Sequence, residues 1–124
     1  MSKKKILIVE DEIFTAEALR LDLEQMGYEV CSLVSSGEKA IQIATNEKPD
    51  VVLMDVRLKG KLGGLKAGEA IRSRLGIPII YMSGYLEEEI KEKAGIDECF
   101  RCLQKPFERI EIKNMVESLF EKKQ

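Results

Sequence analysis

The sequence has no histidine, and no apolar stretch in it approaches the roughly 20 residues that cross a membrane. The apolar run 6–9 is too short for the core of a signal peptide, and acidic residues follow it directly. The net charge is only −2, so no excess of positive charge indicates binding to nucleic acid or to an anionic membrane surface. We therefore expect a cytoplasmic protein that binds neither.

Cysteine is also scarce, since the chain has only Cys31, Cys99 and Cys102. An odd number of cysteines in a chain without a targeting segment indicates reduced thiols. Cys99 and Cys102 form a C-x-x-C pattern, but the sequence offers no histidine and no fourth sulfur as further ligands. Residues three apart in a strand also point to opposite faces. We expect buried, inert thiols rather than a zinc or redox site.

What the chain does have is a regular alternation of strand-like and helical patterns. Its 124 residues, 44% hydrophobic and 34% charged, suit one soluble globular domain over 1–124, with its core at about 4–122. The expected strands are 5–10, 28–34, 51–55, 77–82 and 98–103, and the expected helices are about 13–26, 36–48, 67–75, 86–94 and 112–120. This alternation predicts an α/β fold. It is a flavodoxin-like, doubly wound, five-stranded parallel sheet of order 2-1-3-4-5 with helices on both faces.

Asp55 ends the most apolar of these strands. Four apolar residues, 51–54, precede it, as is typical of a central strand buried on both faces. In open α/β sheets, ligands bind in the crevice beyond the carboxyl ends of the strands. Asp55 is therefore either a loop residue that caps a nearby backbone N–H, or a nucleophile or metal ligand.

Other polar residues follow strands at the same predicted edge, namely Glu10, Asp11, Ser83 and Lys105. Taken singly, they could be helix caps or a solvated lysine. Taken together, three carboxylates in one crevice repel each other unless a cation intervenes, and Mg²⁺ prefers oxygen ligands of this kind. Lys105 and Ser83 could then neutralise a phosphoryl group on Asp55, since carboxylates act as nucleophiles in phosphoryl transfer.

Four segments at predicted strand ends resemble the receiver domain of two-component response regulators, of the chemotaxis-regulator type. They are IVEDE at 8–12, VLMDVRL at 52–58, YMSGY at 81–85 and KPF at 105–107. The resemblance covers about residues 4–122. It implies that Asp55 accepts a phosphoryl group from a histidine of a sensor histidine kinase or phosphotransfer protein, in a reaction that needs Mg²⁺ or Mn²⁺.

The resemblance also implies a role for each site residue. The implied metal ligands are Glu10 (through water), Asp11, Asp55 and the backbone carbonyl of Arg57. Ser83 and Lys105 would hold phosphate oxygens, and the bond between Lys105 and Pro106 would be cis. The resemblance further implies a signalling domain rather than an enzyme, limited to self-phosphotransfer and slow self-dephosphorylation.

The implied output surface combines the predicted helix 86–94, strand 98–103 and helix 112–120. It would contact a downstream protein target and could also form a homodimer. The sequence leaves open the kinase, the target, the oligomeric state and whether the chain acts alone or as part of a longer protein.

Two positions depart from the family pattern. Cys102 stands three residues before Lys105, where the family usually has an aromatic ring that turns inward on activation. The sequence leaves open whether Tyr81 or Tyr85 replaces this ring. Glycines at 63 and 64 occupy the region of the family's aspartate before the third helix, and we expect this to change only the loop conformation.

Arg57 and Tyr85 lie two residues after Asp55 and Ser83, where the resemblance places them beside the phosphoryl group. We expect these two large side chains to shield it from water and slow its hydrolysis. Replacing both with alanine should shorten the lifetime of the phosphorylated protein, measured by loss of the added mass with time. An unchanged lifetime would contradict this expectation.

Three other functions fit the sequence less well. A phosphatase with an aspartyl nucleophile commonly needs a second aspartate two residues later, where this chain has Arg57. A phosphorylation-independent interaction module usually lacks one of the site residues, all of which are present here. A dinucleotide-binding domain needs glycines after the first strand, and residues 10–12 are acidic instead.

Overall fold

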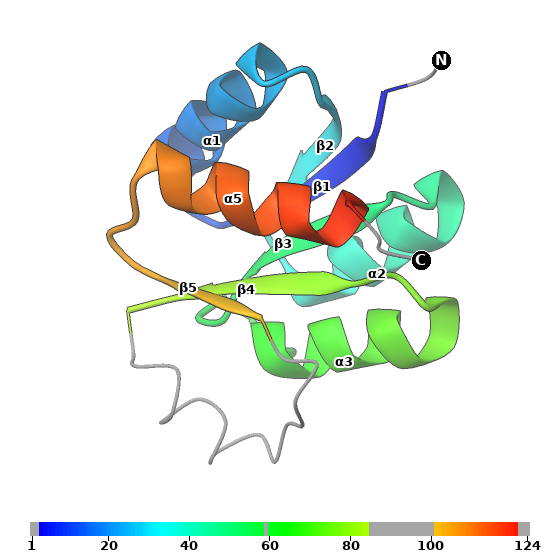
Figure 1. Ribbon diagram of the computed structural model, residues 1–124. Helices are drawn as coiled ribbons and strands as arrows, with labels where there is room; N and C mark the ends of the chain where they lie inside the picture. The colour runs from blue at the N-terminus through cyan, green and yellow to red at the C-terminus, as the bar shows by residue number, and fades with distance from the viewer. Residues whose placement is uncertain (1–2, 59, 85–100, 122–124) are drawn as a thin grey trace.

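The structure, a computed structural model, describes residues 3–58, 60–84 and 101–121. Within these ranges the chain alternates between strands and helices along most of its length (Figure 1). The elements are β1 (Lys5–Val9), α1 (Ile13–Gln25), β2 (Glu29–Val34), α2 (Gly37–Glu47), β3 (Val51–Asp55), α3 (Gly64–Leu75), β4 (Ile79–Ser83), β5 (Cys102–Gln104) and α5 (Arg109–Phe120). All strand pairs are parallel, and the order is β2-β1-β3-β4-β5. The predicted α/β fold and its order 2-1-3-4-5 are confirmed.

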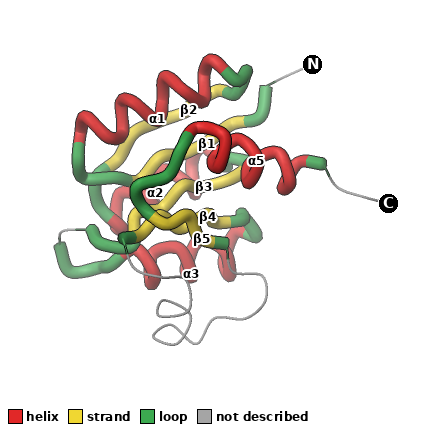
Figure 2. The backbone as a smooth tube through the Cα atoms, turned by 60° about the vertical axis from the view of Figure 1, so that its left-hand side comes forward, coloured by secondary structure: helices red, strands yellow, loops and turns green. Residues whose placement is uncertain are grey.

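Helices cover both faces of the sheet (Figures 1 and 2), and an apolar layer lies beneath them on each face. Alternate residues of a strand point to opposite faces, so neighbours such as Val52 and Leu53 contribute to different layers. One layer joins the sheet to α2 and α3, and the other joins it to α1 and α5. All five residues of β3 are buried. Asp55 therefore ends a strand that is enclosed on both faces.

Several helix ends follow from single residues that the sequence marks. The Ser36 side chain accepts a hydrogen bond from the Lys39 N–H at 3.2 Å and caps α2. Gly76, in the left-handed conformation, ends α3. Gly27, with φ of +98°, follows α1. These three positions are predicted helix boundaries: α2 begins directly after Ser36, and α1 and α3 end within two residues of Gly27 and Gly76.

Some predicted boundaries shift in the structure. β1 ends at Val9, one residue before the predicted end, and β4 covers Ile79–Ser83 instead of 77–82. Pro78 has no N–H for the ladder and precedes the strand, while its carbonyl still accepts from the Val52 N–H at 3.1 Å. β5 is described over Cys102–Gln104. The predicted helix 86–94, residues 98–100 of the predicted strand and Tyr85 lie outside the described residues.

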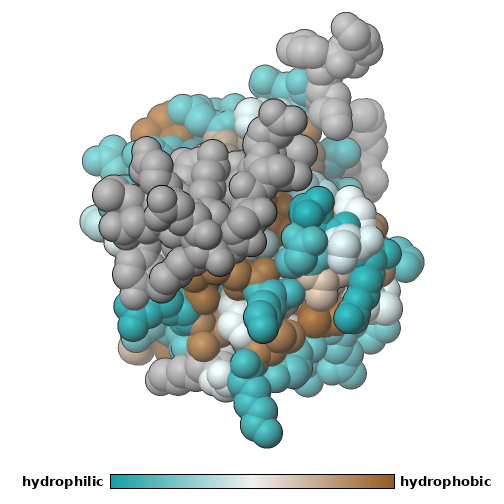
Figure 3. All heavy atoms as spheres, turned by 90° about the horizontal axis from the view of Figure 1, so that it is seen from below, coloured by the Kyte–Doolittle hydropathy of each residue, from teal (hydrophilic) through white to brown (hydrophobic). Residues whose placement is uncertain are grey.

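The outer surface of α3 is polar, because Lys66, Glu69, Arg72 and Arg74 are exposed. Figure 3 views the molecule from below, the side on which α3 lies in Figure 1, and shows many hydrophilic side chains there with apolar ones between them. No helix in the described ranges combines the length and apolar character that a membrane crossing requires.

Candidate functional site

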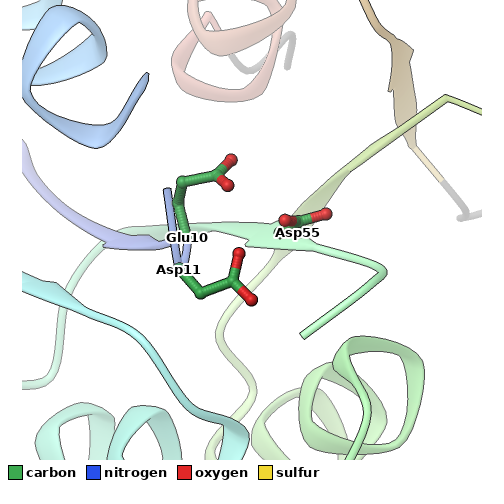
Figure 4. Close-up of side chains that lie close together, drawn as sticks. All are labelled: Glu10, Asp11 and Asp55. Atoms are coloured by element: carbon green, nitrogen blue, oxygen red, sulfur yellow. The ribbon is translucent and has the colours of Figure 1, made fainter. Parts of the chain in front are cut away.

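Three carboxylates gather at the carboxyl ends of β1 and β3 (Figure 4). Glu10 and Asp11 directly follow β1, and Asp55 ends β3. One carboxylate oxygen from each lies within 4.8 Å of the other two. Only 3% of Glu10 and 5% of Asp55 is exposed. Acids this close and this buried need a compensating positive charge.

Lys105 supplies one such charge. Its Nζ lies 3.0 Å from Glu10 Oε1 and 3.5 Å from Asp55 Oδ2. Burial by itself lowers the pKa of a lysine. Here the hydrogen bond to Glu10 and the negative charge of Asp55 outweigh burial, and the pKa of Lys105 is raised. Burial also raises the pKa of Glu10, opposed by the hydrogen bond from Lys105. The ammonium group is therefore held in its charged form between the two acids.

Backbone N–H groups orient the acids. Asp55 Oδ1 accepts a hydrogen bond from the Arg57 N–H at 3.1 Å, and Glu10 Oε2 accepts one from the Glu12 N–H at 3.2 Å. The Val56 N–H donates to the Met82 carbonyl at 2.9 Å, which ties the turn after Asp55 to β4. The carboxylates of Glu10 and Asp55 are thus each hydrogen-bonded to the main chain.

Ser83 and Lys105 are held side by side through the main chain. Ser83 ends β4 and is 1% exposed, and its carbonyl accepts from the Lys105 N–H at 2.6 Å. The next peptide bond, between Lys105 and Pro106, is cis.

The three acids and Lys105 line one cleft of about 560 Å³. Its lining comprises Glu10, Asp11, Glu12, Asp55, Arg57, Leu58, Gly84 and Lys105. The structure therefore brings together the predicted acids, Arg57 and the predicted lysine in this cleft, while Ser83 directly precedes the lining residue Gly84 in the chain. Tyr85 falls outside the described residues.

Cys102 lies beside a buried aromatic ring. It pairs with Tyr81 of β4 in the sheet register, and both residues belong to the α2–α3 layer. Tyr81 is 4% exposed and packs on α3 at Gly68, where an added Cβ would lie 2.4 Å from the tyrosine oxygen. Burial, with a contribution from the charge of Glu69, raises the pKa of Tyr81 to about 12. Tyr81 is thus an aromatic ring packed between β4 and α3, next to the small side chain of Cys102.

A second hollow, which the sequence patterns did not indicate, adjoins the acidic cleft. Its volume is about 690 Å³, and Lys105 lines both hollows. Phe14 and Ala18 of α1 line it together with Pro106 and Phe107. Phe14 is 84% exposed, unusually high for a phenylalanine. The only sequence signal for this hollow is that Phe14 lies outside the buried helical stripe of Ala16, Leu19 and Leu23.

Comparisons with known proteins agree with this arrangement. The family model described as the response regulator receiver domain matches residues 6–117. The transcriptional regulatory protein PdtaR of Mycobacterium tuberculosis is 32% identical over 108 residues, which are 84% of this chain and 50% of that protein. The transcriptional regulatory protein PhoP of Bacillus subtilis, named for alkaline phosphatase synthesis, is 37% identical over 95 residues, 76% of this chain and 38% of that protein. This chain thus spans half or less of the length of these two relatives.

A solved structure extends the likeness to three dimensions. The receiver domain of a Pseudomonas aeruginosa sensor histidine kinase, crystallised with a magnesium ion coordinated in its active-site cleft, matches with a TM-score of 0.83 and 29% identity. The match covers 98% of this chain and all of that one. The family model spans most of the chain, and the fold and the acidic cleft agree with it. This chain belongs to the family of response regulator receiver domains, which are signalling domains.

Proposed function

We propose that this chain receives a phosphoryl group on Asp55 from a histidine of a sensor histidine kinase or phosphotransfer protein. The observation that carries the proposal is the position of Asp55, buried yet facing a cleft that also holds two acids and a lysine. The phosphorus–nitrogen bond of the donor breaks as a phosphorus–oxygen bond forms to the Asp55 carboxylate. The electron pair of the broken bond stays on the departing imidazole.

The donor atoms of the cleft suit a hard divalent cation. Glu10, Asp11 and Asp55 offer carboxylate oxygens within 4.8 Å of one another, and Mg²⁺ or Mn²⁺ binds such oxygens. We propose Asp11, Asp55 and the Arg57 carbonyl as direct ligands, with Glu10 acting through water. When bound, the ion supplies positive charge that offsets the charge of the incoming phosphoryl oxygens.

Lys105 and Ser83 complete the proposed site. Lys105 Nζ already lies 3.5 Å from Asp55 Oδ2, close enough to contact an oxygen of a phosphoryl group on that residue. Ser83 ends the neighbouring strand, β4, and its hydroxyl would donate a hydrogen bond to a second oxygen of the phosphoryl group. Neither group makes or breaks a covalent bond, so both act by stabilising charge.

Incubation with acetyl phosphate and Mg²⁺, followed by intact-mass measurement, tests this function. We expect the protein to gain the mass of one phosphoryl group, and to gain none when EDTA removes the metal. A protein that stays unmodified with Mg²⁺, or that is modified equally in EDTA, would contradict the proposal.

The apolar hollow beside the cleft supports a protein as the natural donor. We propose that it seats the histidine-bearing helix of that donor, because Lys105 joins the hollow to the acidic cleft. A helix held against Phe14 and Phe107 would have its histidine next to Asp55. A small donor such as acetyl phosphate needs no such contact.

Phe14→Ala should therefore slow transfer from a phosphorylated kinase or phosphotransfer protein about tenfold or more, as loss of a central aromatic contact does. Labelling by acetyl phosphate should stay within twofold of wild type. Leu21→Ala is the matched control, since Leu21 is also exposed on α1 but lies outside the hollow. Equal slowing with both donors, or no slowing with the protein donor, would exclude this docking site.

We further propose that phosphorylation acts on the surface of β5, α5 and the predicted helix 86–94. This surface would contact a downstream protein in the cytoplasm and could form a homodimer. Under this proposal the domain itself contacts neither nucleic acid nor membrane.

A further inference from the structure

The first residue of α3, Gly64, lies directly against the backbone of Asp55. A Cβ added to Gly64 would lie 1.9 Å from the Asp55 carbonyl oxygen and 2.9 Å from Val56 Cα. Distances below 3.0 Å are essentially never adopted by a real Cβ. The Gly64 N–H also donates to the Val56 carbonyl at 3.2 Å. Only a residue without a side chain lets α3 start at this place.

The turn after β3 links this contact to the acidic cleft. The Asp55 side chain accepts from the Arg57 N–H at 3.1 Å, so the carboxylate is bonded to the same turn that Gly64 touches. Arg57 itself lines the cleft. If a side chain at position 64 moves this turn, the Asp55 carboxylate and the Arg57 carbonyl move with it.

A second glycine lies close to the last part of the loop that connects β3 to α3. Gly37, the first residue of α2, lies so close to Leu62 that an added Cβ would be 2.8 Å from its carbonyl oxygen. Gly64 therefore contacts the start of the loop between β3 and α3, at Asp55 and Val56. Gly37 contacts the loop near its end, at Leu62. Leu58 and Leu62, within the loop, pack against the α2–α3 layer.

We propose that Gly64 is a positioning residue for metal-dependent phosphorylation. Its lack of a side chain seats α3 on the Asp55 peptide and sets the relative position of two metal ligands, the Asp55 carboxylate and the Arg57 carbonyl. Gly37 packs against Leu62 of the same loop. This inference rests on the proposed function, because it assigns a role toward the metal that the function requires.

The chain offers two matched controls for Gly64→Ala. In Gly68→Ala the new Cβ would meet the Tyr81 side chain at 2.4 Å, so this variant disturbs the packing of the same helix away from the cleft. In Gly63→Ala the Cβ would meet nothing within 4 Å. Comparison of the three separates a positioning effect from general destabilisation.

Each variant is titrated with Mg²⁺ alone by calorimetry, and its melting temperature and labelling by acetyl phosphate are measured. We expect Gly64→Ala to weaken Mg²⁺ binding roughly tenfold or more, the scale seen when a residue that supports a metal ligand is changed. Gly68→Ala should lower the melting temperature but keep the Mg²⁺ affinity within twofold of wild type. Gly63→Ala should resemble wild type in all three measurements.

The outcomes separate the two proposals. If wild type binds no Mg²⁺ and is not labelled, the proposed function fails, and the role of Gly64 fails with it. If wild type binds Mg²⁺ but Gly64→Ala and Gly68→Ala have the same affinity, only the role of Gly64 is overturned. If Gly64→Ala does not fold, Gly37→Ala tests the loop from its other end. A several-fold loss of Mg²⁺ affinity then supports the proposal, and wild-type affinity overturns it.

Discussion

Asp55→Asn is expected to abolish labelling by acetyl phosphate. The amide that replaces the carboxylate offers no anionic oxygen to attack phosphorus, while the fold is kept because the two side chains have nearly the same shape. The neighbouring acids do not take over the reaction. Glu10 is paired with Lys105 at 3.0 Å, and Asp11 follows a different strand. Intact mass should show less than one hundredth of the wild-type labelling rate.

Asp50→Asn is the matched control for this result. Asp50 precedes β3, at the opposite end of the strand from Asp55, and its carboxylate accepts from the Lys5 N–H. It should be labelled at the wild-type rate. In metal-free buffer, Asp55→Asn should also raise the melting temperature, because one of three mutually repelling carboxylates is gone. Labelling of Asp55→Asn at the wild-type rate would move the phosphoacceptor to another residue.

Lys105→Met is expected to slow labelling on the order of 10² to 10³-fold, as loss of one charge-stabilising donor does at other active sites. It should also destabilise the metal-free protein. The Glu10 side chain is fully enclosed, and the variant leaves it without its ion-pair partner. Such losses reach about 3–5 kcal/mol for fully buried pairs. Since 30% of the lysine side chain is exposed, we expect about 1–3 kcal/mol from denaturant unfolding.

Two further variants separate charge from geometry in this experiment. Lys105→Arg keeps a positive charge and should recover most of the stability, but its planar guanidinium does not place a single donor at the same point, so labelling should stay slow. Lys113→Met removes a lysine of α5 that is paired with Glu117 at 2.9 Å across one helical turn, and it should have little effect on stability. If Lys105→Met were as stable and as readily labelled as Lys113→Met, Lys105 would have no role in the site.

The parts of the fold that could be predicted are those that depend on patterns of neighbouring residues in the sequence. The run 51–55 is apolar up to its last residue, and β3 has the predicted bounds because a strand buried on both faces tolerates no polar residue before its end. The gathering of the acids followed from topology alone. Parallel strands end at one edge, so residues after β1, β3, β4 and β5 had to meet there.

The contacts that depend on three-dimensional distance could not be predicted. Lys105 and Glu10 are 95 positions apart, and no periodicity reveals that they form an ion pair. The glycines at 63 and 64 look alike in the sequence, yet of the two only Gly64 lies against backbone atoms, those of Asp55 and Val56. The start of α5 at Arg109, three residues before the predicted start, could not be predicted either. Its capping box is formed by Glu108 and Glu111, while the usual signature begins with serine or threonine.

The position of Lys105 between the acidic cleft and the hollow under Phe14 has a thermodynamic consequence. A donor seated in the hollow and a phosphoryl group on Asp55 would both act on the same ammonium group. By linkage, the factor by which phosphorylation changes the affinity for the donor must equal the factor by which the bound donor changes the equilibrium constant for phosphorylation. If the phosphoryl group draws the lysine away from the hollow, release of the spent donor is favoured by the same free energy that holds the new charge in place.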